Sequence, residues 1–196
     1  MGSGPLLWEY RFVLIEIAPL RFDVDLDLRY ATADNLTGAP IYARPLCLLH
    51  ADAVPFLERA VALARGLGLR LRLFDGFRPV EAQRRLWQAL PDPLYIADPR
   101  HGSNHSRGTA LDLTLADGAG RPLEMGTLFD AMTPLSHHGR TDLPAEVQRH
   151  RALLAGVMAG AGWHAYPYEW WHYQIPGAET YPLLSDSPSV GKRMMD

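Results

Sequence analysis

The sequence predicts an α+β fold, a single domain in which a central, mainly antiparallel sheet is flanked by helices. Its 196 residues suit one domain, because most domains contain about 100–200 residues. The expected helices and strands follow one another too irregularly for a doubly wound parallel sheet. In addition, Asp117-Gly118 is a hairpin signal. We expect residues 1–196 to form this domain, with an N-terminal extension over about residues 1–20 and a C-terminal tail over about residues 184–196.

The first half of the chain is expected to contain a helix, a strand and a second helix. Residues 52–65 place four apolar side chains on one helical face, namely Val54, Leu57, Val61 and Ala64. Residues 69–74 are typical of a short strand, and Asp75-Gly76 forms a turn after it. Pro79 suits the first position of a helix that runs to about residue 90. We therefore expect Arg78 at a strand-to-helix junction.

The second half is expected to contain a long loop, an acidic strand and a helix. Residues 91–108 are rich in small polar residues and read as a long loop, which in a compact domain is often functional. Residues 109–115 alternate leucines with other residues, which predicts a half-buried strand with Asp112 on the face away from the leucines. Residues 147–161 have helical spacing, and a last strand is expected around residues 171–175.

The composition excludes several classes of partner. Nineteen Lys and Arg against 22 Asp and Glu give a net charge of -3, so no positive excess favours nucleic acid or an anionic membrane. No span reaches about 18 uninterrupted apolar residues, and Glu9, Arg11 and Glu16 interrupt the apolar start of the chain. We therefore expect a cytoplasmic protein. The single cysteine, Cys47, lies in an apolar run and is expected to be a buried thiol.

Two short motifs contain residue types that bind metals. His105 and Asp112 form H-x6-D, and Glu169 and His172 form E-x-x-H. Two imidazoles and a carboxylate are three ligands for tetrahedral Zn²⁺, with a fourth position left for water as in catalytic sites. Glu169 is then a spare base, which we expect in the turn that enters the last strand. Spacing alone leaves a second interpretation open, in which no metal is bound. His105 is then an ordinary loop residue, Asp112 caps a turn or pairs with Arg107, and His172 is a strand histidine whose hydrogen bonds are satisfied within the protein.

Longer stretches around these motifs resemble the zinc D-alanyl-D-alanine dipeptidases, the family that includes the vancomycin-resistance dipeptidase. In chain order they are residues 29–38 (RYATADNLTG), 74–79 (FDGFRP), 102–115 (GSNHSRGTALDLTL), 125–130 (MGTLFD) and 169–173 (EWWHY). They follow the family's order over most of the chain. The resemblance implies zinc-dependent cleavage of the D-Ala-D-Ala dipeptide, with one zinc held by His105, Asp112 and His172 and with Glu169 as the general base.

The resemblance also implies roles for residues around the metal. Arg78 matches an arginine near the zinc, where a fixed guanidinium would stabilise the oxyanion formed at the amide carbonyl; alternatively it braces Asp75. Asp130 and Tyr30 match residues near the substrate amino group, and Ser103 matches one near its carboxylate. The alternatives are that Asp130 caps a helix and that Ser103 shapes the loop.

Three positions depart from the vancomycin-resistance sequence. Phe74 and Phe77 replace a Trp and a Tyr, and Asn104 replaces a Ser. Asn104 also occurs among the chromosomal dipeptidases, which favours that branch.

Two other functions remain open at this stage. The same metal site could serve a D,D-carboxypeptidase that acts on longer muropeptides, or a zinc-binding module without activity. A spare base and an oxyanion donor favour an enzyme with a small dipeptide substrate, because a structural ion needs neither. We expect His137 and His138 to be structural or surface residues, because adjacent side chains rarely point at one ion. We expect Trp170 and Trp171 to form wall and core.

Overall fold

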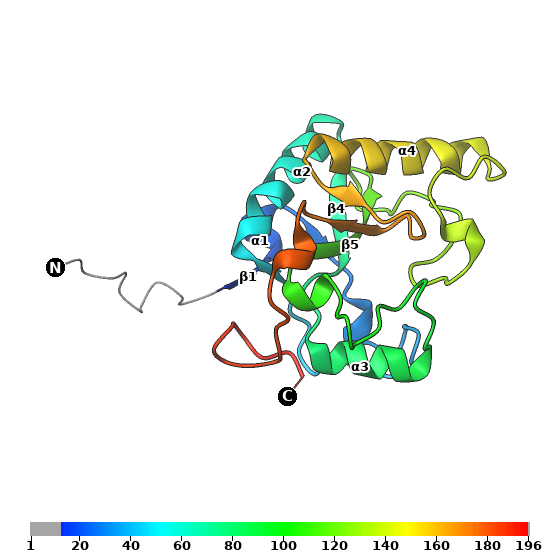
Figure 1. Ribbon diagram of the computed structural model, residues 1–196. Coiled ribbons are helices and arrows are strands. Elements are labelled where there is room, and N and C mark those ends of the chain that lie inside the picture. The colour runs from blue at the N-terminus through cyan, green and yellow to red at the C-terminus, as the bar shows by residue number, and fades with distance from the viewer. Residues whose placement is uncertain (1–12, 196) are drawn as a thin grey trace.

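The structure is a computed structural model that describes residues 13–195. Its strands and α-helices, in chain order, are β1 (Leu14–Glu16), α1 (Pro19–Phe22), β2 (Asp25–Leu26), β3 (Leu48–His50), α2 (Val54–Gly66), β4 (Arg70–Asp75), α3 (Val80–Ala89), β5 (Ala110–Ala116), α4 (Ala145–Gly160), β6 (His164–Ala165) and β7 (His172–Gln174) (Figure 1). Short 3-10 helices lie between them, namely η1 (Arg29–Ala31), η2 (Ala51–Ala53), η3 (His105–Arg107), η4 (Pro134–Ser136) and η5 (Ala178–Thr180).

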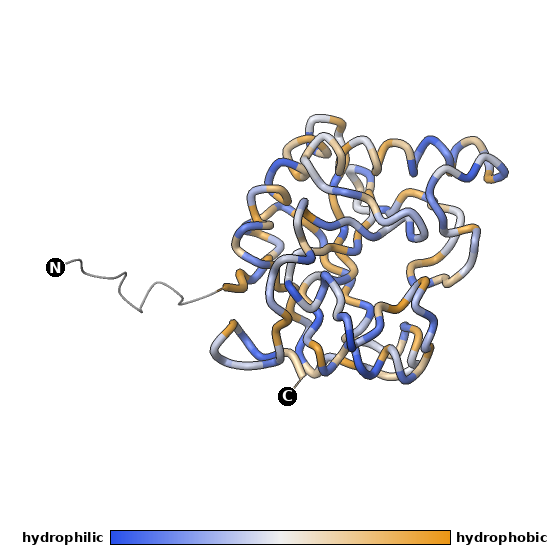
Figure 2. The backbone as a smooth tube through the Cα atoms, viewed as in Figure 1, coloured by the Kyte–Doolittle hydropathy of each residue, from blue (hydrophilic) through white to orange (hydrophobic). Residues whose placement is uncertain are grey.

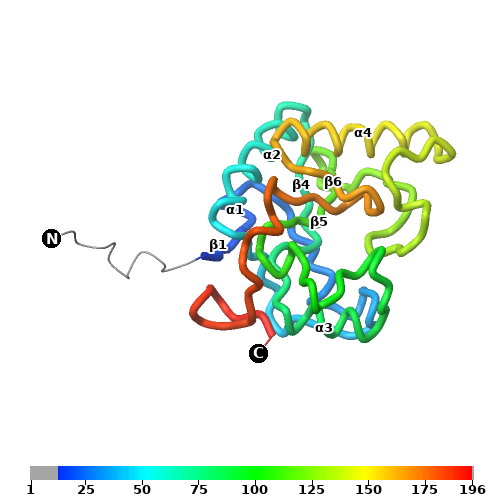
Figure 3. The backbone as a smooth tube through the Cα atoms, in the orientation of Figure 1, coloured from blue at the N-terminus to red at the C-terminus, as the bar shows by residue number. Residues whose placement is uncertain are grey.

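The central sheet has five strands in the order β2-β4-β5-β7-β6. Only the pairing of β2 with β4 is parallel, while β4, β5, β7 and β6 pair antiparallel. Helices α2 and α4 pack against each other and against β4 and β5, whereas α3 lies at the opposite end of the molecule (Figures 1 and 3). The predicted α+β class with a mainly antiparallel central sheet and flanking helices is therefore confirmed.

Apolar segments gather along the strands at the centre of the molecule, and polar segments lie toward the periphery (Figure 2). The main core contains Leu57 of α2, Leu73 of β4 and Leu154 of α4, all fully buried. Cys47 is also buried in this core, as predicted. Across residues 13–195, every helix is either too short or too polar to cross a bilayer.

Strand β5 differs from its prediction, because it is buried along its whole length. The three leucines face the main core as expected. The opposite face is covered as well, so that Asp112 and Thr114 are each only 2% exposed. Alternation identifies the two faces of a strand, but it does not reveal that segments distant in sequence cover the second face.

The expected N-terminal extension contains part of the fold. Strand β1 pairs antiparallel with β3, with Leu14 opposite His50, and Ile17 is fully buried. The fold therefore includes residues well before position 20. Glu9 and Arg11 lie outside the described residues.

The expected C-terminal tail is also packed against the domain. The backbone N–H of Leu184 donates to the carbonyl of Ser106 at 2.8 Å. Met194 is fully buried in a second core cluster that also contains Leu86 and Tyr42. The segment after residue 184 thus covers the side of the molecule that carries α3.

Candidate metal centre and active site

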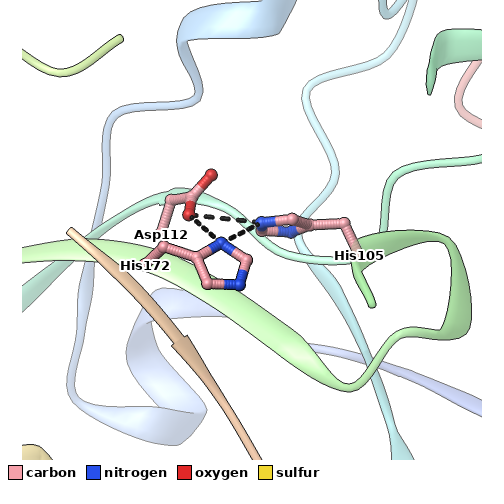
Figure 4. Close-up of side chains that lie close together, drawn as sticks. All are labelled: His105, Asp112 and His172. Carbon is pink, nitrogen blue, oxygen red and sulfur yellow. Dashed lines mark hydrogen bonds and ion pairs between the residues drawn. The ribbon is translucent and has the colours of Figure 1, made fainter. Parts of the chain in front are cut away.

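Three side chains meet at one buried point. His105 Nε2 lies 3.2 Å from Asp112 Oδ1, and His172 Nδ1 lies 3.1 Å from the same oxygen. The two imidazole nitrogens are 3.0 Å apart. Figure 4 shows these atoms pointing toward one another from three separate segments. The structure therefore brings together the three predicted ligands, although they span almost seventy residues of sequence.

The sheet register places two of these ligands side by side. Asp112 of β5 is opposite His172 of β7 on one side and opposite Asp75 of β4 on the other. His105 comes from η3, which ends at Gly108 in a left-handed conformation (φ 69°). A Cβ on Gly108 would lie 2.7 Å from a Leu14 side-chain carbon, so this tight turn into β5 requires glycine.

The arrangement fits a tetrahedral metal ion. Zinc bonds of about 2.0–2.1 Å place neighbouring ligand atoms roughly 3.3 Å apart, close to the distances found here. His105 Nδ1 lies 2.7 Å from the carbonyl oxygen of Gly76, and His172 Nε2 lies 3.4 Å from Gln174 Oε1. These oxygens accept hydrogen bonds and so favour a proton on each outer nitrogen, which in a neutral imidazole leaves the lone pair on the inner nitrogen. Burial lowers the pKa of His172, which also favours the neutral ligand form. In this form the two inner nitrogens and the Asp112 oxygen are all hydrogen-bond acceptors that face one another, so a cation between them would stabilise the arrangement.

Glu169 lies beside the cluster, in the turn before β7 where we expected it. It is 6% exposed, and its Oε2 is 3.8 Å from His172 Nδ1. Burial, together with the negative charges of Asp112 and Asp130, raises the pKa of Glu169 well above its usual range. The carboxyl group is therefore close enough to serve the site without belonging to the tight group of three atoms.

Arg78 connects the cluster to the layer beneath it. Its Nε donates to Asp75 Oδ2 at 2.8 Å, its Nη1 to Gln83 Oε1 at 3.0 Å and its Nη2 to Asp112 Oδ2 at 3.3 Å. The guanidinium carbon lies 4.9 Å from the centre of the Tyr30 ring. The brace to Asp75 therefore exists, and the same guanidinium also reaches the cluster, so the two interpretations are compatible.

Negative charge exceeds positive charge in and beneath this part of the described structure. The carboxyl groups of Asp75, Asp112, Asp130 and Glu169 surround the single guanidinium of Arg78. Burial raises the pKa of Asp75 and that of Asp130, to about 7. The pKa of Asp112 is instead lowered, because the charge and hydrogen bonds that His105 and His172 supply when protonated outweigh burial. A divalent cation and a cationic ligand group would together offset this imbalance.

Asp130 presents a free acceptor atom to the cavity. Tyr30 donates its hydroxyl hydrogen to Asp130 Oδ1 at 2.9 Å. Asp130 Oδ2 is buried and has no hydrogen-bond partner within residues 13–195. Asp130 lies in a turn rather than at a helix N-terminus, with φ at 61°, so the alternative of a helix cap is wrong.

A cavity of about 150 Å³ joins these groups. Its lining includes all eight residues that the sequence analysis assigned to the site, namely Tyr30, Arg78, Ser103, His105, Asp112, Asp130, Glu169 and His172. The Ser103 hydroxyl accepts a hydrogen bond from the His105 backbone at 3.2 Å. Ser103 therefore does shape the loop, while its hydroxyl hydrogen is left for another acceptor.

The opposite wall of the cavity consists of residues that the sequence analysis missed. Residues 93–97 line it, and two contacts tie them across the rim. Tyr166 donates its hydroxyl hydrogen to the Leu94 carbonyl at 2.8 Å, and the Tyr95 hydroxyl lies 3.1 Å from His137 Nε2. No motif marks this segment; its one signal is its place in a long loop.

The contacts of Arg107, of the two adjacent histidines and of the two adjacent tryptophans decide the remaining alternatives. Arg107 contacts the carbonyls of Tyr181 and His101, and it is Arg78 that pairs with Asp112. His137 and His138 lie outside the three-ligand group. Trp170 is buried in the core, and Trp171 is buried and also lines the cavity, as expected.

A compact cluster of two imidazoles and a carboxylate, with a spare carboxyl group facing a small cavity, is typical of metal-dependent hydrolases. The family model of the M15 peptidases, described as D-ala-D-ala dipeptidase, matches residues 12–189. This chain belongs to that family.

Individual relatives agree with this membership. The chain is 47% identical over 173 residues to the D-alanyl-D-alanine dipeptidase of Escherichia coli K12, covering 88% of this chain and 90% of the relative. It is 33% identical over 180 residues to the D-alanyl-D-alanine dipeptidase of Enterococcus faecium, covering 80% and 87%. A solved structure of a zinc-bound mutant of the vancomycin-resistance D,D-pentapeptidase VanY aligns with a TM-score of 0.44 and 16% identity, over 87% of this chain and 90% of that chain.

Proposed function

We propose that this protein hydrolyses the D-Ala-D-Ala dipeptide to two D-alanines and that it uses a zinc ion held by His105, Asp112 and His172. The observation that carries the proposal is the convergence of three ligand atoms within 3.0–3.2 Å of one another, in a chain whose relatives are D-alanyl-D-alanine dipeptidases. When bound, zinc supplies a Lewis acid that polarises the scissile carbonyl and makes a water molecule more acidic.

Glu169 is the proton carrier in this proposal. Its carboxylate accepts a proton from the attacking water and returns it to the nitrogen of the leaving D-alanine. Burial raises the pKa of Glu169 above its usual range, which suits a group that must both accept and return a proton.

Arg78 stabilises the negative charge that develops on the amide oxygen. Its hydrogen bonds to Asp75 and Gln83 fix the guanidinium before substrate arrives. A donor that the fold holds in place does not have to reorient during the reaction. Water molecules would have to reorient, so the fixed guanidinium stabilises the transition state better.

The two ends of the dipeptide are recognised by opposite charges and polar groups. The substrate ammonium binds Asp130 Oδ2, which has no other hydrogen-bond partner in the described part of the chain, while Tyr30 holds the other carboxylate oxygen. The Ser103 hydroxyl donates to the substrate carboxylate. This arrangement gives a function to a buried, incompletely paired aspartate.

The wall formed by residues 93–97 favours a dipeptide over a longer muropeptide. A cavity of about 150 Å³ is comparable to engineered cavities that hold a single benzene molecule. The wall formed by residues 93–97 is tied at Leu94 and Tyr95, and in this proposal it restricts the space for a peptide chain attached to the amino end. A D,D-carboxypeptidase needs an open path at that end.

The test is release of D-alanine by the purified, zinc-loaded protein. We expect rapid release from D-Ala-D-Ala, loss of activity with a chelator and recovery with zinc, and little release from N-acetyl-D-Ala-D-Ala. Preference for the acetylated substrate would favour the carboxypeptidase instead. Tightly bound zinc without release from either substrate would favour the non-catalytic binding module.

A further inference from the structure

The two histidines of the cluster are oriented in different ways. The outer nitrogen of His105 faces a main-chain carbonyl, that of Gly76, at 2.7 Å. The outer nitrogen of His172 points away from the cluster (Figure 4) and faces a side-chain amide oxygen, that of Gln174, at 3.4 Å. The orientation of His172 therefore depends on a side chain that can be changed without altering the backbone.

Gln174 is itself held by a second amide. Asn104 Nδ2 donates to Gln174 Oε1 at 2.8 Å, which turns the oxygen of Gln174, rather than its NH₂ group, toward His172. Asn104 immediately precedes His105, and Gln174 lies two residues after His172 on the same face of β7. The amide pair thus links the two segments that carry the histidine ligands.

We propose that Gln174, oriented by Asn104, is a positioning residue that keeps the proton on His172 Nε2 and the lone pair of Nδ1 on the cluster, and that this amide pair sets the affinity for zinc. The proposal deepens the zinc site of the proposed function and rests on it. Outer groups that orient a ligand histidine typically change metal affinity by about 10–100-fold when removed.

The proposal gives a physical meaning to a departure noted in the sequence. Asn104 stands where the vancomycin-resistance sequence has a serine. A serine hydroxyl is shorter than the asparagine amide, whose Nδ2 contacts the Gln174 oxygen at 2.8 Å, so we expect the serine to fall short of hydrogen-bond distance. We therefore expect the serine variant to leave Gln174 free to turn its NH₂ group toward His172, where it no longer accepts the Nε2 proton.

Both amides also line the cavity, so the competing role is direct contact with substrate. The two roles differ in what they change. Loss of a positioning residue weakens zinc binding in the absence of substrate, whereas loss of a substrate contact raises KM and leaves zinc affinity unaltered.

The experiment compares Q174L, Q174E, N104S and the double variant N104S/Q174L with the wild type. Gln88, an exposed residue of α3, provides the matched control Q88L. Zinc affinity is measured by competition with a chromogenic chelator, the fold of the metal-free protein by its thermal midpoint, and activity by D-alanine release at saturating zinc.

We expect zinc binding to weaken about 10–100-fold in Q174L, less in N104S, and no further in the double variant than in Q174L within about twofold. Q174E retains an acceptor and should bind zinc at least as tightly as the wild type, as Q88L should. An unchanged zinc affinity in Q174L and N104S, with a raised KM, would overturn the proposal in favour of substrate contact. Equal weakening in Q174E and Q174L would also overturn it. If the wild type binds no zinc, the proposed function itself fails.

Discussion

The ionised carboxylate of Asp130 destabilises the folded protein, and a single substitution should remove this destabilisation. Burial raises its pKa to about 7 from an ordinary value of 3.8, a difference of about three units. At about 1.4 kcal/mol per unit, ionised Asp130 destabilises the metal-free fold by about 4 kcal/mol. Because the pKa is raised in the folded state, this cost is absent below about pH 4, grows up to about pH 7 and stays constant above it.

The variant Asp130→Asn removes the charge with little change in shape. Its amide oxygen can still accept from Tyr30, and asparagine tolerates the positive φ at this position. Its NH₂ group replaces the partnerless Oδ2 and costs about 1–3 kcal/mol as an unpaired buried donor. We therefore expect D130N to be more stable than the wild type by at least about 1–3 kcal/mol at pH 8, and to lose this advantage at pH 4, where the protonated carboxyl group of the wild type also leaves an unpaired buried donor.

Urea unfolding of the metal-free proteins between pH 4 and pH 9 measures this difference. Glu58→Gln, at an exposed position of α2, is the matched carboxyl-to-amide control and should follow the wild type at every pH. The zinc-loaded D130N enzyme should lose about 10–150-fold in kcat/KM, the value of one charge-assisted hydrogen bond to the substrate ammonium. A stability difference that is the same at pH 4 and pH 8 would refute the reasoning.

Three further predictions concern the metal and the reaction. Glu169→Ala should keep its zinc but lose about 10²–10⁴ in kcat, as metal analysis and D-alanine release would show; activity near the wild-type level would exclude Glu169 as the base. Arg78→Lys keeps the charge but not the three-way fork, and its kcat should fall about 10²–10³-fold; a change confined to KM would argue against oxyanion stabilisation. His172→Ala should lose zinc, so that a chelator lowers the thermal midpoint of the wild type but not of the variant; a zinc content equal to that of the wild type would remove His172 from the ligand set.

The sequence predicts which residues meet in the inner cluster, because these residues lie in short motifs. His105, Asp112, Glu169 and His172 form two motifs that the sheet register then aligns. Some of the groups that orient the site lie outside these motifs. Gln83 reaches Arg78 from α3, and partners of this kind become neighbours only when the chain folds.

The elements that sequence reasoning missed are short or covered by distant segments. Strands β2 and β6 have two residues each, too few to show alternation. The wall at residues 93–97 has no regular structure, and it is held by contacts such as that between Tyr166 and Leu94, which are 72 residues apart. Periodicity reports which face of an element is apolar, but not what covers the other face.

X-ray absorption at the zinc edge, on the purified protein with its metal content determined, tests the central claim most directly. We expect one zinc per chain, bound to two imidazole nitrogens and one carboxylate oxygen, with this signature lost in His105→Ala. A chain that takes up no zinc at micromolar free metal, or a zinc ion whose ligands include no imidazole, would contradict the account.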